Sequence, residues 1–335
     1  GHVDFTAEVE RSLRVLDGAV VVFSAVEGVE AQSETVWRQA DRYNVPRICF
    51  INKLDRIGAD FHRTFNEIRT RLCENTGSER QLVAVTIPLN LVGQVDNLAA
   101  DRTIVDLLNR QLLVFSGEDE NWKVSKVEPP DHLSDEIESW RTSLIDTVCQ
   151  FDDEAMELYF ANEDLSADQL KKTIRAATLQ GRLTPVFAGT ALKCVGVQSV
   201  LDGIVDFLPS PLDRPPVEGL DPSTATDAEP KRLSRKPDAD APFCGLLFKI
   251  VADKHNDLYF MRIYSGTISN GSRMINPRTG KKEFITRLWH IQADSREKIE
   301  QDSAQAGEIV GVVGIKDSVT GDTLCDPKAQ IVLEQ

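Results

Sequence analysis

Residues 18–24 read GAVVVFS, residues 32–43 read QSETVWRQADRY, and residues 46–51 read PRICFI. The first and third are continuous apolar runs, which are typical of strands buried on both faces of a parallel sheet. The segment between them has the mixed polar pattern of a helix, and a second helical pattern with one apolar face follows at residues 60–73. This alternation of strand and helix predicts an α/β fold with a doubly wound sheet.

Sequence patterns of the same kind divide the whole chain into predicted domains. The α/β pattern covers residues 1–74 and resumes at residues 183–211, and residues 75–182 between them predict an inserted, mainly helical subdomain of mixed character. Residues 212–241 are rich in Pro, Asp and Ser, which predicts a linker. Residues 242–335 carry short strand patterns separated by Gly turns, which predict a β-barrel domain.

Within the insertion, helices are predicted at residues 134–150, 152–160 and 166–179. The last of these begins with Ser166 and carries Gln169 three residues on, which is the signature of a capping box. The acidic residues that open the second helix suit the helix dipole, so we expect no metal site there.

Composition narrows the class of partner. The chain has 38 basic and 53 acidic side chains and a formal charge of −15. Proteins that bind nucleic acid by neutralising many phosphates usually carry a net positive charge. We therefore expect no DNA partner and at most local contacts with RNA. No apolar run is long enough to cross a bilayer, so we expect no membrane partner. The six cysteines are scattered without a C-x-x-C pair, which favours reduced thiols over disulfides or zinc.

The sharpest motif is Asn52-Lys53-Leu54-Asp55, directly after the second predicted strand. Loops at the carboxyl ends of parallel strands are where such sheets bind ligands. The carboxylate of Asp55 can accept two hydrogen bonds, which matches the ring N–H and the exocyclic amino group on one edge of guanine. The Lys53 stem can lie along the base plane, and the Asn52 amide can brace neighbouring loops. A guanine-binding loop is therefore favoured over the alternative, a polar turn after a strand.

A second loop, Gly189-Thr190-Ala191-Leu192-Lys193, follows the predicted strand at residues 184–188. A small residue there lets a backbone N–H approach the keto oxygen of guanine, which adenine lacks. Alone, this pentapeptide is better explained as the first turn of a helix. Paired with the Asn-Lys-x-Asp loop, it predicts the other side of a base pocket.

Four longer stretches carry a resemblance to a known family. They are GHVDFTAEVER through NKLDRIGADF at residues 1–61, TPVFAGTALKCVGVQSVLDGIVDFLPSPLD at 184–213, YSGTISNGSRMINPRTGKKE at 264–283 and GIKDSVTGDTLCD at 314–326. Together they resemble elongation factor G, the GTPase that drives translocation in translation. The resemblance implies a P-loop-NTPase-like G domain with an inserted G′ subdomain, followed by the β-barrel domain II.

The resemblance also implies roles for individual residues. By position, the guanine-contacting residues would be Asn52, Lys53 and Asp55 together with Thr190, Ala191, Leu192 and Lys193. Gly1 and His2 resemble the end of the D-x-x-G-H switch II motif, in which the histidine orients the attacking water; the alternative is a remnant of an expression tag. Cys194 and Val195 depart from the Asn-Lys pair often found there.

The groups that hold phosphates and magnesium do not occur in this sequence. No G-x-x-x-x-G-K-[ST] loop is present, nor are the family's switch I Thr and switch II Asp. We therefore expect GTP or GDP as the ligand but Mg²⁺ only in the complete protein, with this chain alone hydrolysing no GTP and binding guanine nucleotides weakly. We also expect an unpaired, apolar sheet edge at residues 18–24.

The resemblance implies that the complete protein is a ribosome-dependent GTPase that moves tRNA and mRNA, with rRNA and a ribosomal stalk protein as partners. A paralogous recycling or release-type GTPase, acting mainly as a GTP-regulated ribosome-binding module, is the alternative. The expected location is the cytoplasm, with the mitochondrial matrix as the alternative.

Overall fold

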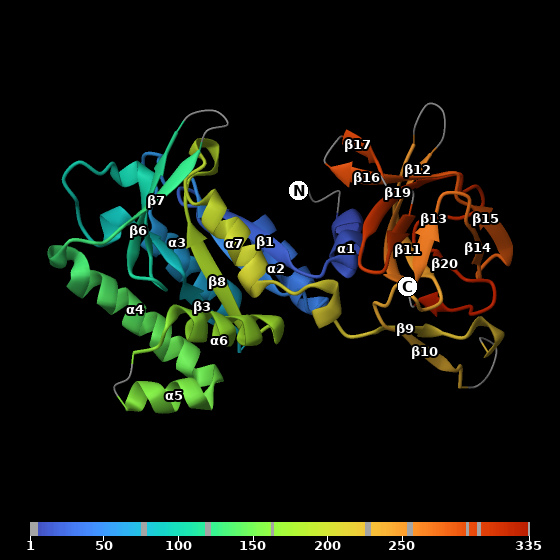
Figure 1. Ribbon diagram of the computed structural model, residues 1–335, viewed down its shortest axis with the longest axis horizontal. Coiled ribbons are helices and arrows are strands. Elements are labelled where there is room, and N and C mark those ends of the chain that lie inside the picture. The colour runs from blue at the N-terminus through green and yellow to red at the C-terminus, as the bar shows by residue number, and fades with distance from the viewer. Residues whose placement is uncertain are drawn as a thin grey trace. The chain divides into compact units, whose positions relative to one another are not determined.

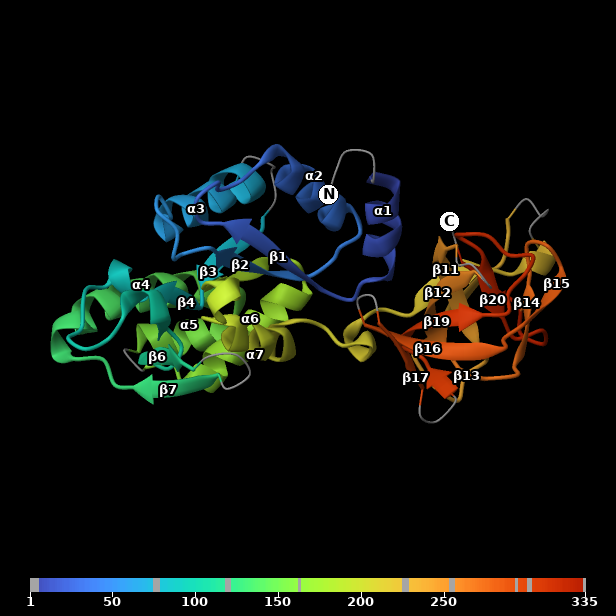
Figure 2. The same cartoon turned by 90° about the horizontal axis from the view of Figure 1, so that it is seen from above.

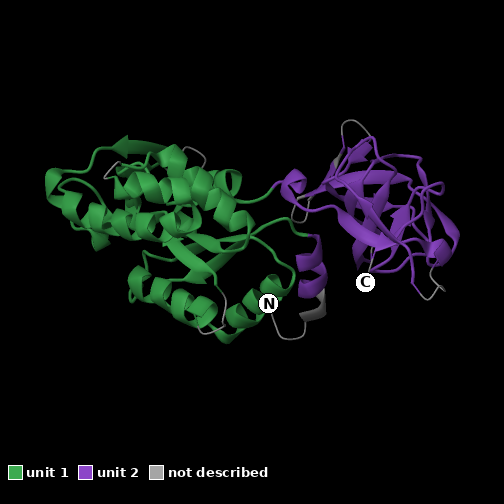
Figure 3. Cartoon of the chain, turned by 90° about the horizontal axis from the view of Figure 1, so that it is seen from below, with its two compact units in different colours: residues 1–3, 16–209 green, residues 4–15, 210–335 purple. Residues whose placement is uncertain are grey.

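In the computed structural model, the protein forms two compact units (Figures 1 and 3). The structure describes residues 6–74, 79–117, 122–161, 164–224, 229–252, 257–292, 295–299 and 303–333. The first unit contains Leu16–Pro209. The second contains the chain from Ser210 onward together with helix α1 (Thr6–Val15). No helix among the described residues is long and apolar enough to span a membrane.

A four-stranded parallel sheet forms the centre of the first unit. Its strands follow the order β1, β2, β8, β3, and their bounds are Ala19–Ser24, Arg47–Asn52, Leu183–Ala188 and Gln81–Ala84. Helices cover both faces, with α2 (Ala31–Arg42) and α3 (Phe61–Glu67) on one side and α6 (Ala167–Leu179) and α7 (Val197–Phe207) on the other (Figure 2). The predicted α/β doubly wound fold is therefore confirmed.

Burial follows the position of each strand in this sheet. The central strands β2 and β8 are buried almost throughout, as their continuous apolar sequences predict. Strand β1 lies at one end of the sheet, and its side chains alternate, leaving Val20 36% and Val22 57% exposed. The apolar sheet edge expected at residues 18–24 is therefore present.

The inserted segment contains more strand than its helical patterns predict. After β3, which belongs to the parallel sheet, comes an antiparallel sheet of β4 (Thr86–Pro88), β5 (Thr103–Asp106), β6 (Gln111–Ser116) and β7 (Lys123–Val127). The insertion boundary predicted at residue 75 thus falls before a strand of the main sheet. The two short 3₁₀ turns η4 (Leu89–Leu91) and η5 (Ala100–Arg102) join β4 to β5.

The helices of the insertion match their local signals. They are α4 (Ser134–Val148), α5 (Asp153–Phe160) and α6. Ser166 and Gln169 form the predicted capping box at the start of α6. Asp152 caps α5 by accepting hydrogen bonds from the next turn, so the acidic residues there serve the helix start, as predicted.

The second unit is the predicted β-barrel domain, whose core holds Leu247, Met261, Ile263, Val310 and Val312. Its strands are β11 (Cys244–Val251), β12 (Leu258–Ser265), β13 (Thr267–Ser269), β14 (Arg273–Asn276), β15 (Lys281–Phe284), β16 (Arg287–Gln292), β17 (Ser295–Lys298), β18 (Ser303–Gln305), β19 (Ile309–Val313) and β20 (Thr323–Cys325). Eight of them form one antiparallel sheet in the order β15, β14, β20, β11, β12, β19, β16, β17.

The predicted linker at residues 212–241 is wrong as a description of this segment. It contains β9 (Val217–Leu220) and β10 (Arg232–Arg235), which pair with each other and with β21 (Val332–Leu333) in a three-stranded sheet. Backbone hydrogen bonding to a strand more than a hundred residues away orders a segment whose composition is typical of a loop.

The cysteines are free thiols, as predicted. Cys49 is fully buried on β2, where it packs as a small apolar side chain. Burial raises the pKa of Cys73 to about 12, which keeps it protonated at neutral pH.

Candidate functional site

The two motif loops start from neighbouring strands. Strands β2 and β8 pair in parallel, with Ile51 opposite Ala188, so their carboxyl ends meet at the same edge of the sheet. The pairing continues into the loops, because the Gly189 N–H donates to the Ile51 carbonyl at 3.0 Å and the Leu54 N–H donates to the Gly189 carbonyl at 3.3 Å. The two loops therefore form one surface rather than two separate turns.

The side-chain amide of Asn52 ties these loops together. Its Oδ1 accepts one hydrogen bond from the Lys53 N–H and one from the Ala191 N–H, each at 2.8 Å. The bracing role predicted for Asn52 is thus present in the structure. Because the Ala191 N–H already has this acceptor, the adjacent amide of Leu192 becomes the candidate donor to a keto oxygen. The Leu192 side chain is 82% exposed at this turn.

Close backbone contacts shape the second loop. A Cβ on Gly189 would lie 2.2 Å from the Val195 carbonyl oxygen, so only glycine fits at this position. Thr190 and Val195 close the turn with reciprocal backbone hydrogen bonds of 2.9 and 3.1 Å. Cys194, between them, has a φ of 51°. A non-glycine residue in the left-handed region carries strain, and such residues cluster at functional sites.

The first loop carries the same kind of strain. Lys53 has a φ of 66°, which turns the chain sharply after β2. Its ammonium lies 3.5 Å from the carboxylate of Glu27, in the turn that follows β1. This ion pair is exposed at both ends, so it contributes little to stability.

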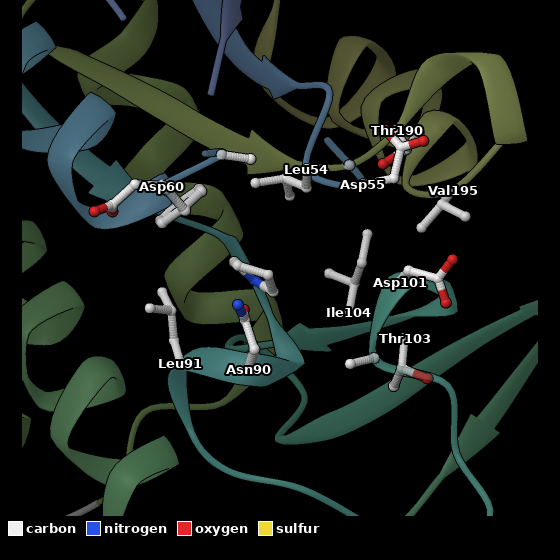
Figure 4. A pocket seen from close by; sticks show the side chains of 15 residues that line it. Leu54, Asp55, Asp60, Asn90, Leu91, Asp101, Thr103, Ile104, Thr190 and Val195 are labelled. Atoms are coloured by element: carbon white, nitrogen blue, oxygen red, sulfur yellow. The ribbon is translucent and has the colours of Figure 1, made fainter. Parts of the chain in front are cut away.

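Asp55 lies in a cavity that the two loops share with the insertion. The cavity measures about 470 Å³, and Asp55 and Thr190 lie on one side of it while Asn90 and Asp101 line the other (Figure 4). The Asp55 side chain is 11% exposed, so its carboxylate is shielded but still accessible. A shielded carboxylate beside the candidate donor amide of Leu192 matches the requirements for reading a base edge.

Lys193 joins Asp55 to the insertion. Its ammonium is 3.4 Å from Asp55 Oδ2 and 3.1 Å from Asp101 Oδ2, on η5. A hydrogen bond to Asp101, followed by the contact with Asp55, raises the pKa of Lys193, so the side chain carries its charge at neutral pH.

Both domains match families of known proteins. Residues 1–210 match the model described as the elongation factor Tu GTP binding domain, and residues 257–325 match elongation factor Tu domain 2. The chain belongs to this translational GTPase family. Guanine nucleotide binding is therefore the function of the first unit at the level of the family.

A solved structure shows the same fold. A protein from Thermus thermophilus superposes with a TM-score of 0.74 at 21% identity, and the match covers 98% of this chain and 43% of that one. At this identity the likeness shows the fold alone. This chain spans less than half the length of that protein.

Within this GTPase fold, the predicted base-contacting residues lie together. Asn52, Lys53, Asp55 and the turn from Thr190 to Lys193 meet at the ends of β2 and β8. His2 lies outside the described residues. The described residues include no group of three or more His, Cys, Asp or Glu side chains that could hold a metal ion.

Two acidic residues of the site were not predicted from the sequence. Glu27 pairs with Lys53, and Asp101 pairs with Lys193 across a separation of 92 residues. Neither residue belongs to a recognisable motif. Only the placement of β1 and of the insertion against the loops brings them to the site.

Proposed function

We propose that Asp55 and the turn from Thr190 to Lys193 recognise guanine, and that the protein is an elongation factor G. The observation that carries the proposal is the single Asn52 oxygen that ties the Asn-Lys-x-Asp loop to the Ala191 amide. It holds the loop that bears the Asp55 carboxylate and the loop that bears the Leu192 amide at a fixed separation. Family membership and the long stretches that resemble elongation factor G support the same interpretation.

In the proposed base recognition, four residues have separate roles. Asp55 accepts hydrogen bonds from the ring N–H and the exocyclic amino group, and the Leu192 amide donates to the keto oxygen. Lys53 lies along one face of the base, and Asn52 keeps the loops in register. Adenine would leave the carboxylate and the amide unpaired, which disfavours it strongly in a site built around hydrogen bonds.

The residue roles in GTP hydrolysis are proposed from the resemblance to elongation factor G. We propose that His2 orients the attacking water in the complete protein, and that Mg²⁺ accompanies the nucleotide there. The chain of 335 residues alone is expected to hydrolyse no GTP and to bind GDP weakly, because its sequence contains no phosphate-binding loop. Titration with labelled GDP checks this expectation, and Mg²⁺-dependent affinity at or below about 1 μM would contradict it.

The proposed partner is the ribosome, through rRNA and a stalk protein. The net charge of −15 supports docking of basic protein surfaces, with the insertion as the proposed contact for the stalk. We place the protein in the cytoplasm, or in the mitochondrial matrix if it serves organellar ribosomes.

Two ribosome assays on protein expressed from the complete gene test the function. In the first, the protein and GTP are mixed with ribosomes awaiting translocation, and movement of a fluorescent mRNA is followed. In the second, they are mixed with post-termination ribosomes, and subunit splitting is followed by light scattering. Rapid mRNA movement is the expected result. Splitting without mRNA movement would reject translocation in favour of recycling.

A further inference from the structure

Lys193 lies between two carboxylates that belong to different parts of the first unit. Asp55 comes from the loop after β2, and Asp101 comes from η5 in the insertion. The ammonium donates a hydrogen bond to Asp101 at 3.1 Å, and it lies farther from Asp55, at 3.4 Å. Asp101 is therefore the stronger partner of the two in this arrangement.

Hydrogen bonds fix the backbone of the turn that carries Asp101. The turn η5 is closed by a hydrogen bond of 3.0 Å from the Arg102 N–H to the Ala99 carbonyl, which also accepts from the Thr103 hydroxyl at 2.9 Å. Thr103 is 1% exposed and begins β5, so the turn is continuous with the antiparallel sheet of the insertion. The position of the Asp101 carboxylate is thus set by the fold of the insertion.

In the proposed function, guanine and the Lys193 ammonium compete for the carboxylate of Asp55. Base recognition requires its carboxylate to accept two N–H groups from guanine. The Lys193 ammonium competes for the same oxygens, because an opposite charge at this distance attracts the carboxylate. A guanine base must therefore displace Lys193 from Asp55 before both hydrogen bonds can form.

We propose that Asp101 is a positioning residue of the nucleotide site: it shares the Lys193 ammonium with Asp55 and retains that ammonium when the base binds Asp55. This inference rests on the proposed role of Asp55. It also makes the insertion a contributor to nucleotide affinity, because a shift of η5 that withdraws Asp101 leaves Asp55 as the remaining partner of Lys193 in this pair of carboxylates. The residue acts through Lys193 and does not contact the nucleotide.

Substitutions of Asp101 and Lys193 test the proposal in protein expressed from the complete gene. GDP and ADP are titrated calorimetrically into the wild type, Asp101→Asn, Lys193→Met, Asp101→Asn with Lys193→Met, and Asp55→Ala. The matched control is Asp96→Asn, which removes one exposed negative charge from the same insertion. Thermal unfolding of each variant verifies that the fold is retained.

The expected result is that Asp101→Asn weakens GDP binding about two- to fivefold, the range expected for a partly exposed ion pair, while Asp96→Asn has no effect. In the Lys193→Met background, Asp101→Asn should no longer change GDP affinity, since the ammonium that Asp101 positions is gone. A merely structural role for Asp101 would weaken binding equally with and without that ammonium.

Different failures are distinguishable. If Asp101→Asn binds GDP as tightly as Asp96→Asn does, or if Asp101→Asn weakens binding as much in the Lys193→Met background as in the wild type, the role of Asp101 is rejected. If the wild type does not prefer GDP to ADP, or Asp55→Ala keeps that preference, the proposed base site itself is rejected.

Discussion

The side-chain oxygen of Asn52 accepts hydrogen bonds from two backbone N–H groups, and both groups belong to the candidate site. Asn52→Ala would leave the N–H groups of Lys53 and Ala191 without their acceptor. Since both hydrogen bonds lie at exposed loop positions, where water can replace the lost acceptor, we expect a loss of only about 0.5–1 kcal/mol in the free energy of unfolding. We expect GDP affinity to fall about tenfold because the loops lose register. Denaturant unfolding and GDP titration measure the two effects.

Asn90→Ala is the control for this prediction. Asn90 is an exposed asparagine that lines the same cavity from the insertion, so the substitution removes an amide without removing the brace. It should change neither quantity by more than the experimental error. Equal effects from the two substitutions would show that Asn52 does not hold the loops together.

At this scale, the sequence was informative where chemistry depends on consecutive residues. The placement of Asp55 after an apolar strand was sufficient to predict its position in a loop at the carboxyl end of that strand, and the structure places it there, beside the shared cavity. The bond from Ala191 to Asn52 spans 139 residues, and the bond from Lys193 to Asp101 spans 92. Contacts of that separation depend on strand order and on how the insertion packs, which no local pattern encodes.

Among the structural elements, the turn between β8 and α7 shows how a loop can be held in a strained conformation. Cys194 adopts a left-handed conformation that asparagine tolerates better than cysteine does. We therefore expect Cys194→Asn to raise the free energy of unfolding by about 0.5–1 kcal/mol. Urea unfolding of the two proteins measures the difference.

Cys194→Ser is the matched variant, because it removes the thiol without adding the asparagine preference for this conformation. It should leave stability unchanged or slightly lower. A stabilisation equal to that of Cys194→Asn would mean that loss of the thiol, rather than relief of backbone strain, is responsible.

Elements with strong local signals could be predicted, and those defined by distant partners could not. The capping box at Ser166 identifies the start of α6 without reference to the rest of the chain. In contrast, β7 is exposed along its whole length, so it lacks the apolar alternation by which strands are recognised. Strand β9 forms because it pairs with β10 and β21, and the sequence of its own four residues does not indicate a strand.

Across the chain as a whole, the second unit is stabilised by a buried polar network around Asp322, whose side chain is 1% exposed. Arg278 donates two hydrogen bonds to it, and Asn276 and the Val319 amide donate one each. Burial alone would raise the pKa of Asp322, but these donors outweigh burial and hold the pKa below its ordinary value.

This network predicts a dependence of stability on pH. Because the pKa of Asp322 is lower in the folded protein than the unfolded value of about 3.9, its contribution is complete above that value and is lost as pH falls through the folded pKa. Asp322→Asn should lose about 2–3 kcal/mol at pH 7, and the difference from wild type should shrink toward pH 2. Urea unfolding at several pH values measures this.

Asp317→Asn is the control, since Asp317 is an exposed aspartate of the same unit that pairs with Lys281 on the surface. Its effect should be small at every pH. A difference between wild type and Asp322→Asn that stays constant from pH 7 to pH 2 would show that the network does not act through the ionised carboxylate.

The nucleobase preference of Asp55→Asn tests the proposed guanine site most directly. Xanthine has a keto group where guanine has its amino group, and an asparagine amide can donate to that oxygen whereas a carboxylate cannot. In calorimetric titrations of the protein expressed from the complete gene, the wild type should prefer GDP to xanthosine diphosphate, and Asp55→Asn should reverse the order. A variant that retains the wild-type preference for GDP would contradict the assignment of Asp55 as the residue that reads the base.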